Sequence, residues 1–180
     1  MSNSEANERF EAYRAELEAH GIPFDDKLIG QGDFTPHSVA PAIEKILSSN
    51  DRLPDAFMFA NDEMAIQGMW LLREKGIRIP DDTAVIGYDD IRESSSQKIP
   101  VTTVAQPLAE MADYAVRTAV DLALGKDVPL ETYLPTRAVI RSSCGCMLHS
   151  VNDVINIRKN SDFSNAKDTI YDRILKILDE

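Results

Sequence analysis

Residues 56–76 read AFMFANDEMAIQGMWLLREKG and residues 83–90 read TAVIGYDD, and these two stretches decide the fold. The apolar run 56–60 follows a Leu-Pro break, and its length is typical of a strand buried on both faces. Asn61 or Asp62 then caps a helix that runs to Lys75, and Gly76 ends it. Residues 83–88 form the next apolar run. The pattern is strand, helix, strand, which favours parallel pairing of the two strands.

The same alternation continues outward in both directions. Helices are predicted over residues 3–20, with Ala6, Phe10, Tyr13 and Leu17 on one face, over a segment capped by Ser38, and over 107–124. Loop residues are predicted at 94–96, and short strands at 27–31, 101–104, 131–134 and 137–141. Together these elements predict an α/β fold: a mainly parallel sheet with helices on both faces, in the manner of a Rossmann-like lobe.

Composition excludes several classes of protein. The chain has 180 residues, of which 43% are hydrophobic and 27% charged, as in ordinary globular domains. Its 30 acidic residues outnumber 19 basic ones, and the net charge of −11 opposes nucleic-acid binding by this chain itself. No apolar run is long enough to span a membrane, and the polar N-terminus has no export pattern, so a cytoplasmic location is expected. The two cysteines are no disulfide framework and suit a reducing compartment.

Polar and aromatic residues follow the successive predicted strands. Phe34 follows the first strand, Asn61 the second, Asp89 the third and Gln106 the fourth. Ligands of open parallel sheets bind beyond the carboxyl ends of the strands, so these residues are the candidate site. The edge has no glycine-rich phosphate loop. It suits a polyol, because carboxylates and amides bond hydroxyls and an aromatic ring packs against a sugar face.

Each of these residues also has a purely structural interpretation. Asn61 and Asp62 are good helix caps, and Asp89 or Asp90 would suit a cap for the turn that follows. An isolated phenylalanine such as Phe34 is usually in the core.

Two sharper chemical alternatives remain open at this point. Asp62, Asp89 and Asp90 would suit Mg²⁺ or acid–base work, although no nucleophile, catalytic histidine or phosphate loop accompanies them. Cys144, Cys146 and His149 form a C-x-C-x-x-H cluster that lacks the fourth ligand of a zinc site. Neither a metal nor a cofactor is therefore expected.

Five blocks of sequence, in order, carry a resemblance to a known family. They are PDA at 54–56, ANDEMA at 60–65, GIRIPDD at 76–82, VIGYDD at 85–90 and TTVAQP at 102–107. Over residues 5–145 the chain resembles the effector-binding core of the lac repressor and galactose repressor family. The resemblance implies a two-lobed fold like that of periplasmic sugar-binding proteins, with a sugar-like effector between the lobes.

The resemblance also implies roles for individual residues. Arg9, in the first helix, matches an arginine that bonds effector hydroxyls or carboxylates, although a surface ion pair with nearby glutamates is its default interpretation. Phe34 matches an aromatic residue that packs against the ligand, and Asn61 an amide of the site. Asp89 matches a hydroxyl-binding carboxylate, and Gln106 lies at the crossing between lobes.

The domain organisation expected from the resemblance has two parts. Residues 1–146 are the C-terminal part of the ligand-binding domain, lacking the DNA-binding headpiece and most of the first lobe, and 107–129 belong to the other lobe. Residues 147–180 are expected to be a linker and an amphipathic helix that carries Ile170, Ile174, Ile177 and Leu178.

The function expected is that of a non-enzymatic sensing module in a transcriptional regulator or related signalling protein. It is expected to form a homodimer and to reach DNA or another output only through a module outside this chain. The alternatives are a sugar receptor of a transport system and a small Asp-dependent α/β enzyme. Activity that depends on Mg²⁺ and needs no partner would favour the enzyme.

Overall fold

The structure is a computed structural model, and it describes residues 4–146. Helices and strands alternate along most of this range, as the sequence predicts. The helices are α1 (Ser4–Ala19), α2 (Val39–Ser49), α3 (Asp62–Glu74), α4 (Arg92–Ser95) and α5 (Leu108–Ala123), with 3-10 turns η1 (Asp26–Leu28) and η2 (Pro36–Ser38). The strands are β1 (Ala56–Met58), β2 (Ala84–Ile86), β3 (Thr103–Ala105) and β4 (Arg137–Val139).

The strands form a mainly parallel arrangement. β1 pairs with β2 in parallel, with Phe57 opposite Val85. Two parallel bridges, Ile86 to Thr102 and Asp89 to Ala105, continue the order to the segment of β3, and β4 runs antiparallel to β3. The carboxyl ends of β1, β2 and β3 therefore point to one edge. The predicted fold class is confirmed, with the antiparallel β4 at the end of the order.

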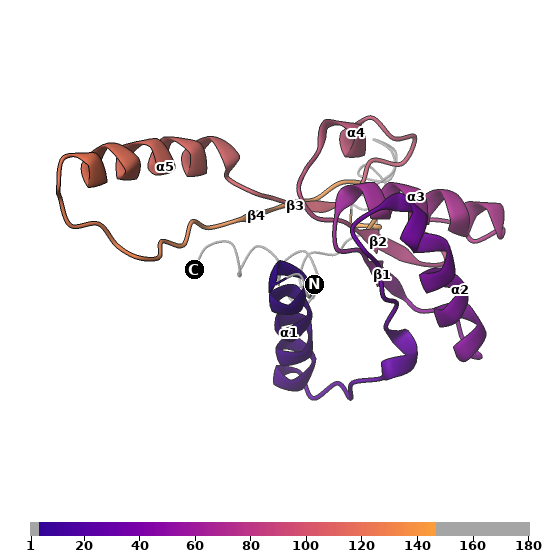
Figure 1. Cartoon of the computed structure of the whole chain (residues 1–180). Helices are drawn as coiled ribbons and strands as arrows, with labels where there is room; N and C mark the ends of the chain where they lie inside the picture. The colour runs from indigo at the N-terminus through magenta and orange to yellow at the C-terminus, as the bar shows by residue number, and fades with distance from the viewer. Residues whose placement is uncertain (1–3, 147–180) are drawn as a thin grey trace, which may run out of the picture.

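The core lies between the β1–β2 pair and the helices α2 and α3, which lie side by side (Figure 1). The helix faces follow from spacing: in α3, Ala65, Met69 and Leu72 recur at helical intervals and are all buried. Gly76 ends α3 with a φ of +79°, a conformation that glycine adopts without steric cost. The other principal members of the core are Val39, Ile43, Ile46, Phe57, Phe59, Met64, Ile79, Val85 and Val101.

Helix α5 projects from this body on an arm that β3 and β4 connect to it (Figure 1). None of its residues is buried. Its apolar stripe is exposed instead, with Leu108 62%, Val116 65% and Val120 52% accessible. The pattern of the helix is right, but its apolar face has no partner among residues 4–146.

The segment 27–31 is not the strand that the sequence predicts. Asp25 caps the 3-10 turn η1, since its side chain accepts a hydrogen bond from the Lys27 N–H. The carbonyls of Lys27 and Ile29 then accept bonds from the Asn50 and Lys45 side chains of α2 and its cap. Because side chains satisfy these carbonyls, the segment runs along α2 rather than joining the sheet.

Three further predictions are corrected. Strand β1 is covered on one face only within the described residues, since Phe57 is buried whereas Met58 is 58% exposed. Ser94 is fully buried in the short helix α4, where a loop is predicted, because its amide and hydroxyl both bond the Ile91 carbonyl. Residues 131–134 form no strand, and Tyr133 is 87% exposed there.

Among residues 4–146, no helix is both long and apolar enough to cross a bilayer. The predicted linker and helix over 147–180 lie outside the described residues.

Candidate functional site

The five predicted site residues gather at the edge formed by the carboxyl ends of β1, β2 and β3. Asn61 and Asp89 each come three residues after the last residue of a strand, and Gln106 directly follows β3. Arg9 comes from α1 and Phe34 from the loop before η2. They form two contact groups, one around Arg9 and one around Asp89.

Arg9 is the centre of the first group. Its guanidinium lies 4.1 Å from the centroid of the Tyr88 ring and 5.6 Å from that of Phe34, both within cation–π range. One terminal nitrogen donates to the Ala60 carbonyl at 3.0 Å, at the end of the buried run. The other pairs with Glu5 at 3.2 Å, so the predicted surface ion pair exists alongside the contacts at the site. These contacts hold a cation over two aromatic faces.

Asn61 joins the first group and is also a helix cap. Its side-chain oxygen accepts a hydrogen bond from the Met64 N–H at 2.9 Å, which identifies it, and not Asp62, as the N-cap of α3. Its amide nitrogen donates to the Phe34 carbonyl at 3.0 Å. The structural interpretation of Asn61 therefore holds, and the same side chain also fixes the backbone that presents Phe34.

Phe34 is half-buried at this edge and is not a core residue. Its φ is +68°, in the left-handed region that phenylalanine rarely adopts. Asp33 supports this turn, since its carboxylate accepts from the Thr35 amide and hydroxyl. These hydrogen bonds hold the pKa of Asp33 below its usual value.

The second group joins Asp89 and Gln106. The Gln106 side-chain amide donates to Asp89 Oδ1 at 2.6 Å. The Asp89 amide donates to the Val104 carbonyl at 2.8 Å, which fixes the backbone against the segment of β3. Asp89 Oδ2 accepts no hydrogen bond from any residue of the described range, so this oxygen is available to a hydroxyl.

Backbone strain is concentrated at this edge. Within residues 4–146, the non-glycine residues with positive φ are Phe34 at 68°, Asp89 at 111° and Asp90 at 57°. Two of them are predicted site residues and the third is adjacent. Such conformations cost of order 1–3 kcal/mol each and persist where surrounding contacts impose them, which is common at ligand sites.

The carboxylates of Asp62 and Asp90 form hydrogen bonds and an ion pair with other residues near this edge. Asp62 is completely buried, and it accepts hydrogen bonds from the Thr103 hydroxyl at 2.6 Å and the Ile91 amide at 3.0 Å. Burial raises the pKa of the Asp62 carboxyl above its ordinary value. Asp90 forms an ion pair with Arg141, whose guanidinium also donates to the Val101 carbonyl. Asp90 does not cap α4, and neither does Asp89, because the cap position is Ile91.

These hydrogen bonds and this ion pair occupy carboxylates that metal binding or acid–base chemistry would need. Two of the three aspartates considered for Mg²⁺ have their carboxylates occupied by the protein. No group of three or more histidine, cysteine or acidic side chains suited to a metal ion occurs in the part of the chain that the structure describes. His149 of the C-x-C-x-x-H cluster lies outside it.

Tyr88 contacts Arg9, a predicted site residue, although the sequence pattern did not predict Tyr88 as one of them. Its ring packs on Arg9, and its carbonyl accepts a hydrogen bond from the Asp62 amide at 2.8 Å. It directly precedes Asp89 at the end of the same strand segment. An aromatic ring next to a predicted site residue at a strand end was the available signal.

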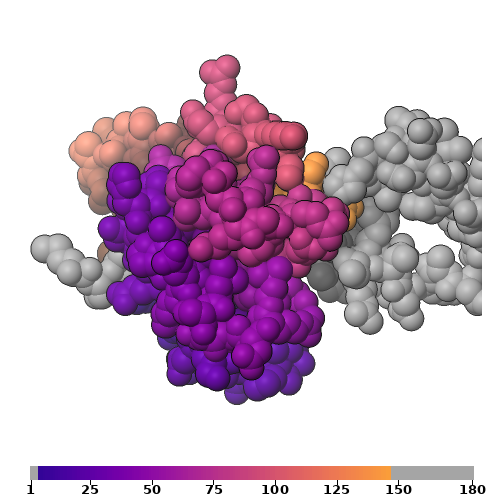
Figure 2. All heavy atoms as spheres, turned by 90° about the vertical axis from the view of Figure 1, so that its right-hand side faces the viewer, coloured from indigo at the N-terminus to yellow at the C-terminus, as the bar shows by residue number. Residues whose placement is uncertain are grey.

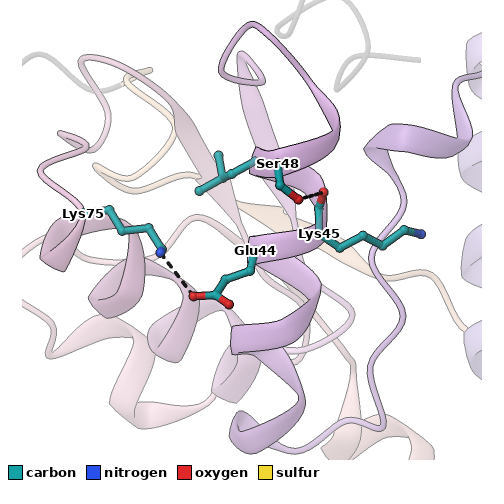
Figure 3. A pocket seen from close by; sticks show the side chains of 5 residues that line it. Glu44, Lys45, Ser48 and Lys75 are labelled. Atoms are coloured by element: carbon teal, nitrogen blue, oxygen red, sulfur yellow. Dashed lines mark hydrogen bonds and ion pairs between the residues drawn. The ribbon is translucent and has the colours of Figure 1, made fainter.

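One hollow of the described surface lies away from this edge. A shallow groove between α2 and α3, about 480 Å³, is lined by Glu44, Lys45, Leu47, Ser48 and Lys75 (Figure 3). Glu44 and Lys75 pair across it at 3.4 Å, so its charges satisfy each other. Figure 2 views the molecule from the right-hand side of Figure 1, where the body is a broad surface. The candidate site is instead the edge at which polar and aromatic groups converge at the ends of β1, β2 and β3.

The chain matches the model of the periplasmic binding protein-like domain over residues 1–144. It is 37% identical over 139 residues to the HTH-type transcriptional regulator CelR of Thermobifida fusca, covering 76% of this chain and 40% of that protein.

Two solved structures support the same relationship. One is a complex of the transcriptional regulator CelR with cellobiose, with a TM-score of 0.71 and 35% identity over 76% of this chain and 42% of that one. The other is the lac repressor dimer bound to operator and the anti-inducer ONPF, with a TM-score of 0.68 and 27% identity over 78% of this chain and 42% of that one. The chain therefore spans about two fifths of the length of these relatives. The periplasmic-binding-protein-like α/β fold expected from the resemblance is confirmed, and the division into two lobes stays a prediction.

Proposed function

Because the chain belongs to the periplasmic binding protein-like domain family, we propose that it is part of a sugar-sensing, effector-binding domain of a lac-repressor-type regulator. The effector binds at the edge where β1, β2 and β3 end. Two features found together at this edge carry the proposal. The Arg9 guanidinium packs against an aromatic ring, and the Asp89 carboxylate keeps one oxygen that accepts no hydrogen bond within the described residues.

Each group has a distinct task in this proposal. Asp89 accepts hydrogen bonds from sugar hydroxyls through Oδ2, while Gln106 keeps its Oδ1 oriented. Arg9 donates to hydroxyl or carboxylate oxygens, and Phe34 and Tyr88 pack against the C–H face of the ring. Asn61 positions Phe34. The arrangement binds and orients a ligand, and no group in it acts as a nucleophile.

The remaining features of the proposal concern the larger protein. Residues 107–129, which include α5, belong to a second lobe, and closure of the two lobes on the effector shifts an existing conformational equilibrium. The regulator acts in the cytoplasm as a homodimer, without catalysis. DNA or another output is reached through a separate module, since the −11 charge of this chain opposes contact with phosphates. The relative named for its cellobiose complex supports a sugar as effector.

Replacing Asp89 by Asn tests the proposal. The variant keeps the shape but loses the charge that strengthens each hydrogen bond, so sugar binding weakens by about 1.5–3 kcal/mol, or roughly tenfold to 150-fold. The free energy of unfolding changes much less. A thermal-shift screen of sugars, cellobiose included, selects the ligand, and calorimetric titration compares the two proteins.

Asp51→Asn is the matched control, because Asp51 is an exposed acid before β1, at the opposite end of the strand from the site. Its affinity for sugar stays that of the wild type. Equal affinities for all three proteins would remove Asp89 from the site.

A further inference from the structure

The only two cysteines of the chain flank one glycine in a turn at the end of the described residues. The Gly145 amide donates to the Ser142 carbonyl at 3.1 Å, and Gly145 has a φ of +74°. Two trans peptides keep the Cα atoms of Cys144 and Cys146 within about 7.6 Å even when extended, and a turn shortens this distance. Disulfides need a Cα separation of roughly 4.4–6.8 Å.

The two cysteines contact each other in this turn. The Cys146 amide donates a hydrogen bond to Cys144 Sγ at 3.2 Å, and the Cys146 thiol lies 3.7 Å from the Cys144 carbonyl oxygen that it faces. Cys144 Sγ in turn lies 3.5 Å from the Arg141 carbonyl. The Cys146 N–H therefore directs the positive end of its dipole at the Cys144 sulfur.

Ser143, which lies inside this turn, attaches it to the sheet. Ser143 is fully buried, and its hydroxyl donates to the Val85 carbonyl at 2.6 Å and accepts from the Thr102 amide at 2.8 Å. These two bonds join β2 to the segment before β3. A methyl group at Gly145 would lie 3.4 Å from Pro80 Cβ, so the turn also packs against the body. These contacts therefore fix the position of the backbone that carries the two cysteines.

Both sulfurs are within reach of small molecules. Cys146 is exposed and Cys144 is half-buried. We propose that Cys144 and Cys146 are a thiol–disulfide pair that exchanges with small-molecule disulfides such as oxidised glutathione.

The exchange has two balanced steps. The Cys144 thiolate attacks one sulfur of the small disulfide, which forms a mixed disulfide and releases one thiolate. The Cys146 thiol gives its proton to the released thiolate and attacks Cys144 Sγ, which forms the internal disulfide and releases a second thiolate. This thiolate takes up the proton that Cys144 lost to solvent before the first step. Overall the two cysteines are oxidised and one small disulfide is reduced to two thiols.

The order of attack follows from the surroundings of the two sulfurs. Partial desolvation of the exposed Cys146 thiol raises its pKa to about 11, and the neighbouring Cys144 adds to the rise through a hydrogen bond and its charge. Cys146 therefore keeps its proton at neutral pH until the mixed disulfide has formed on Cys144.

The test equilibrates the full chain in buffers of reduced and oxidised glutathione, quenches it with acid, alkylates free thiols and measures intact mass. The chain has no other cysteine, so the products are unambiguous. The equilibrium constant for the internal disulfide is expected to be at least about tenfold higher in the folded chain than in the urea-unfolded chain, a difference of ~30 mV. Equal constants would overturn the proposal, because the fold would then contribute nothing to the pair.

Two single variants test the order of attack. Cys146→Ser is expected to accumulate the mixed disulfide on Cys144, and Cys144→Ser to react several-fold more slowly at neutral pH. Circular dichroism of each sample establishes that it is folded. Equal rates for the two variants, or disulfides between chains in place of the internal one in the wild type, would contradict the assignment.

Discussion

The buried Asp62 side chain fixes the backbone around the candidate site without being one of the predicted ligand contacts. It begins α3, yet its carboxylate bonds the Thr103 hydroxyl of β3 and the Ile91 amide that follows the Asp89–Asp90 pair. Three separate segments therefore meet at one side chain. Removing it leaves the Ile91 amide and the Thr103 hydroxyl proton without an acceptor, next to Asp89 and Asp90, whose backbone is held at positive φ.

Asp62→Ala is expected to destabilise the chain by about 2–4 kcal/mol, since two buried polar groups each lose their partner. In Asp62→Asn the side-chain oxygen of the asparagine still accepts from the Ile91 amide, and the side-chain NH₂ of the asparagine can donate to the Thr103 hydroxyl. The loss of unfolding free energy is therefore smaller than in Asp62→Ala. Urea unfolding monitored by circular dichroism measures both variants. Equal stability of Asp62→Ala and the wild type would contradict this role.

The pH dependence of Asp62→Asn has a definite sign. Burial raises the folded-state pKa of Asp62 above 3.8, so the folded chain binds the proton more tightly than the unfolded chain. The contribution of Asp62 to the free energy of unfolding therefore falls as the pH rises through the interval between these two pKa values. The difference between wild type and Asp62→Asn is expected to shift in favour of the variant as the pH rises from below 3.8 through the raised pKa of the folded chain. A shift in the opposite direction would show that the pKa is lowered.

At this scale, much of the candidate site was predictable. The rule that ligands bind beyond strand ends brought Asn61, Asp89 and Gln106 to one edge, where the structure also has them. Phe34 came from the same rule applied to a strand over 27–31 that does not form, and the resemblance supported it. Arg9 came from the resemblance alone, because a single arginine on a helix carries no signal of its own. Tyr88 was missed because an aromatic ring inside an apolar run is indistinguishable from a core residue by pattern.

At the scale of elements, Gly87 explains how closely α3 approaches β2. A Cβ at this position would lie 2.1 Å from Asp62 Oδ1, closer than any atoms can come without movement. The glycine follows β2 directly, and its amide donates to the Thr102 carbonyl at 2.9 Å. Its small size lets the start of α3 rest on the strand end and places Asp62 under the site.

Gly87→Ala is expected to cost about 1–3 kcal/mol, the usual range for overpacking, because the methyl group displaces a buried, hydrogen-bonded carboxylate. Gly125→Ala is the comparison for an alanine that adds backbone strain without a steric clash. Gly125 has nothing within 4 Å of its Cβ position and pays only for its φ of +72°. Thermal unfolding compares the two. A Gly87→Ala protein as stable as the wild type would mean that α3 does not sit this close to the sheet.

The longer elements were predictable and the short ones were not. Helices α2, α3 and α5 agree with the sequence within a few residues, because apolar spacing persists over several turns. The predicted strands 27–31 and 131–134 are wrong because a strand of a few residues exists only where a neighbour pairs with it. The local sequence does not indicate that side chains will satisfy the carbonyls of 27–31. In the structure Lys45 donates to the Ile29 carbonyl, and Asn50 donates to the Lys27 carbonyl.

At the scale of the whole molecule, the arm that carries α5 is the main departure from a packed domain. Its exposed stripe of Leu108, Met111, Val116 and Val120 is a face of the kind that other proteins bury. The chain is therefore expected to self-associate at high micromolar concentration. Sedimentation velocity measures this, and a clean monomer with no binding of apolar dyes would contradict it.

Val116→Glu is expected to weaken this association by at least about tenfold, because burying an apolar valine contributes about 1.5–3 kcal/mol. Leu130→Glu is the matched control, because Leu130 is fully exposed in the loop after α5 and lies outside the stripe. If the two variants associate equally, the stripe of α5 is not the contact face.

The most direct measurement is a nuclear magnetic resonance titration of the isotope-labelled chain with the sugar selected by the thermal-shift screen. Weak binding is sufficient, since dissociation constants on the order of 1–10 mM are resolved by shift changes. The expected result is that the amides of Phe34, Asn61, Tyr88, Asp89 and Gln106 shift together and saturate, and that Asp89→Asn weakens the response. Shifts confined to the groove lined by Glu44, Lys45 and Lys75, or no saturable shift for any sugar, would contradict a sugar site at the strand ends.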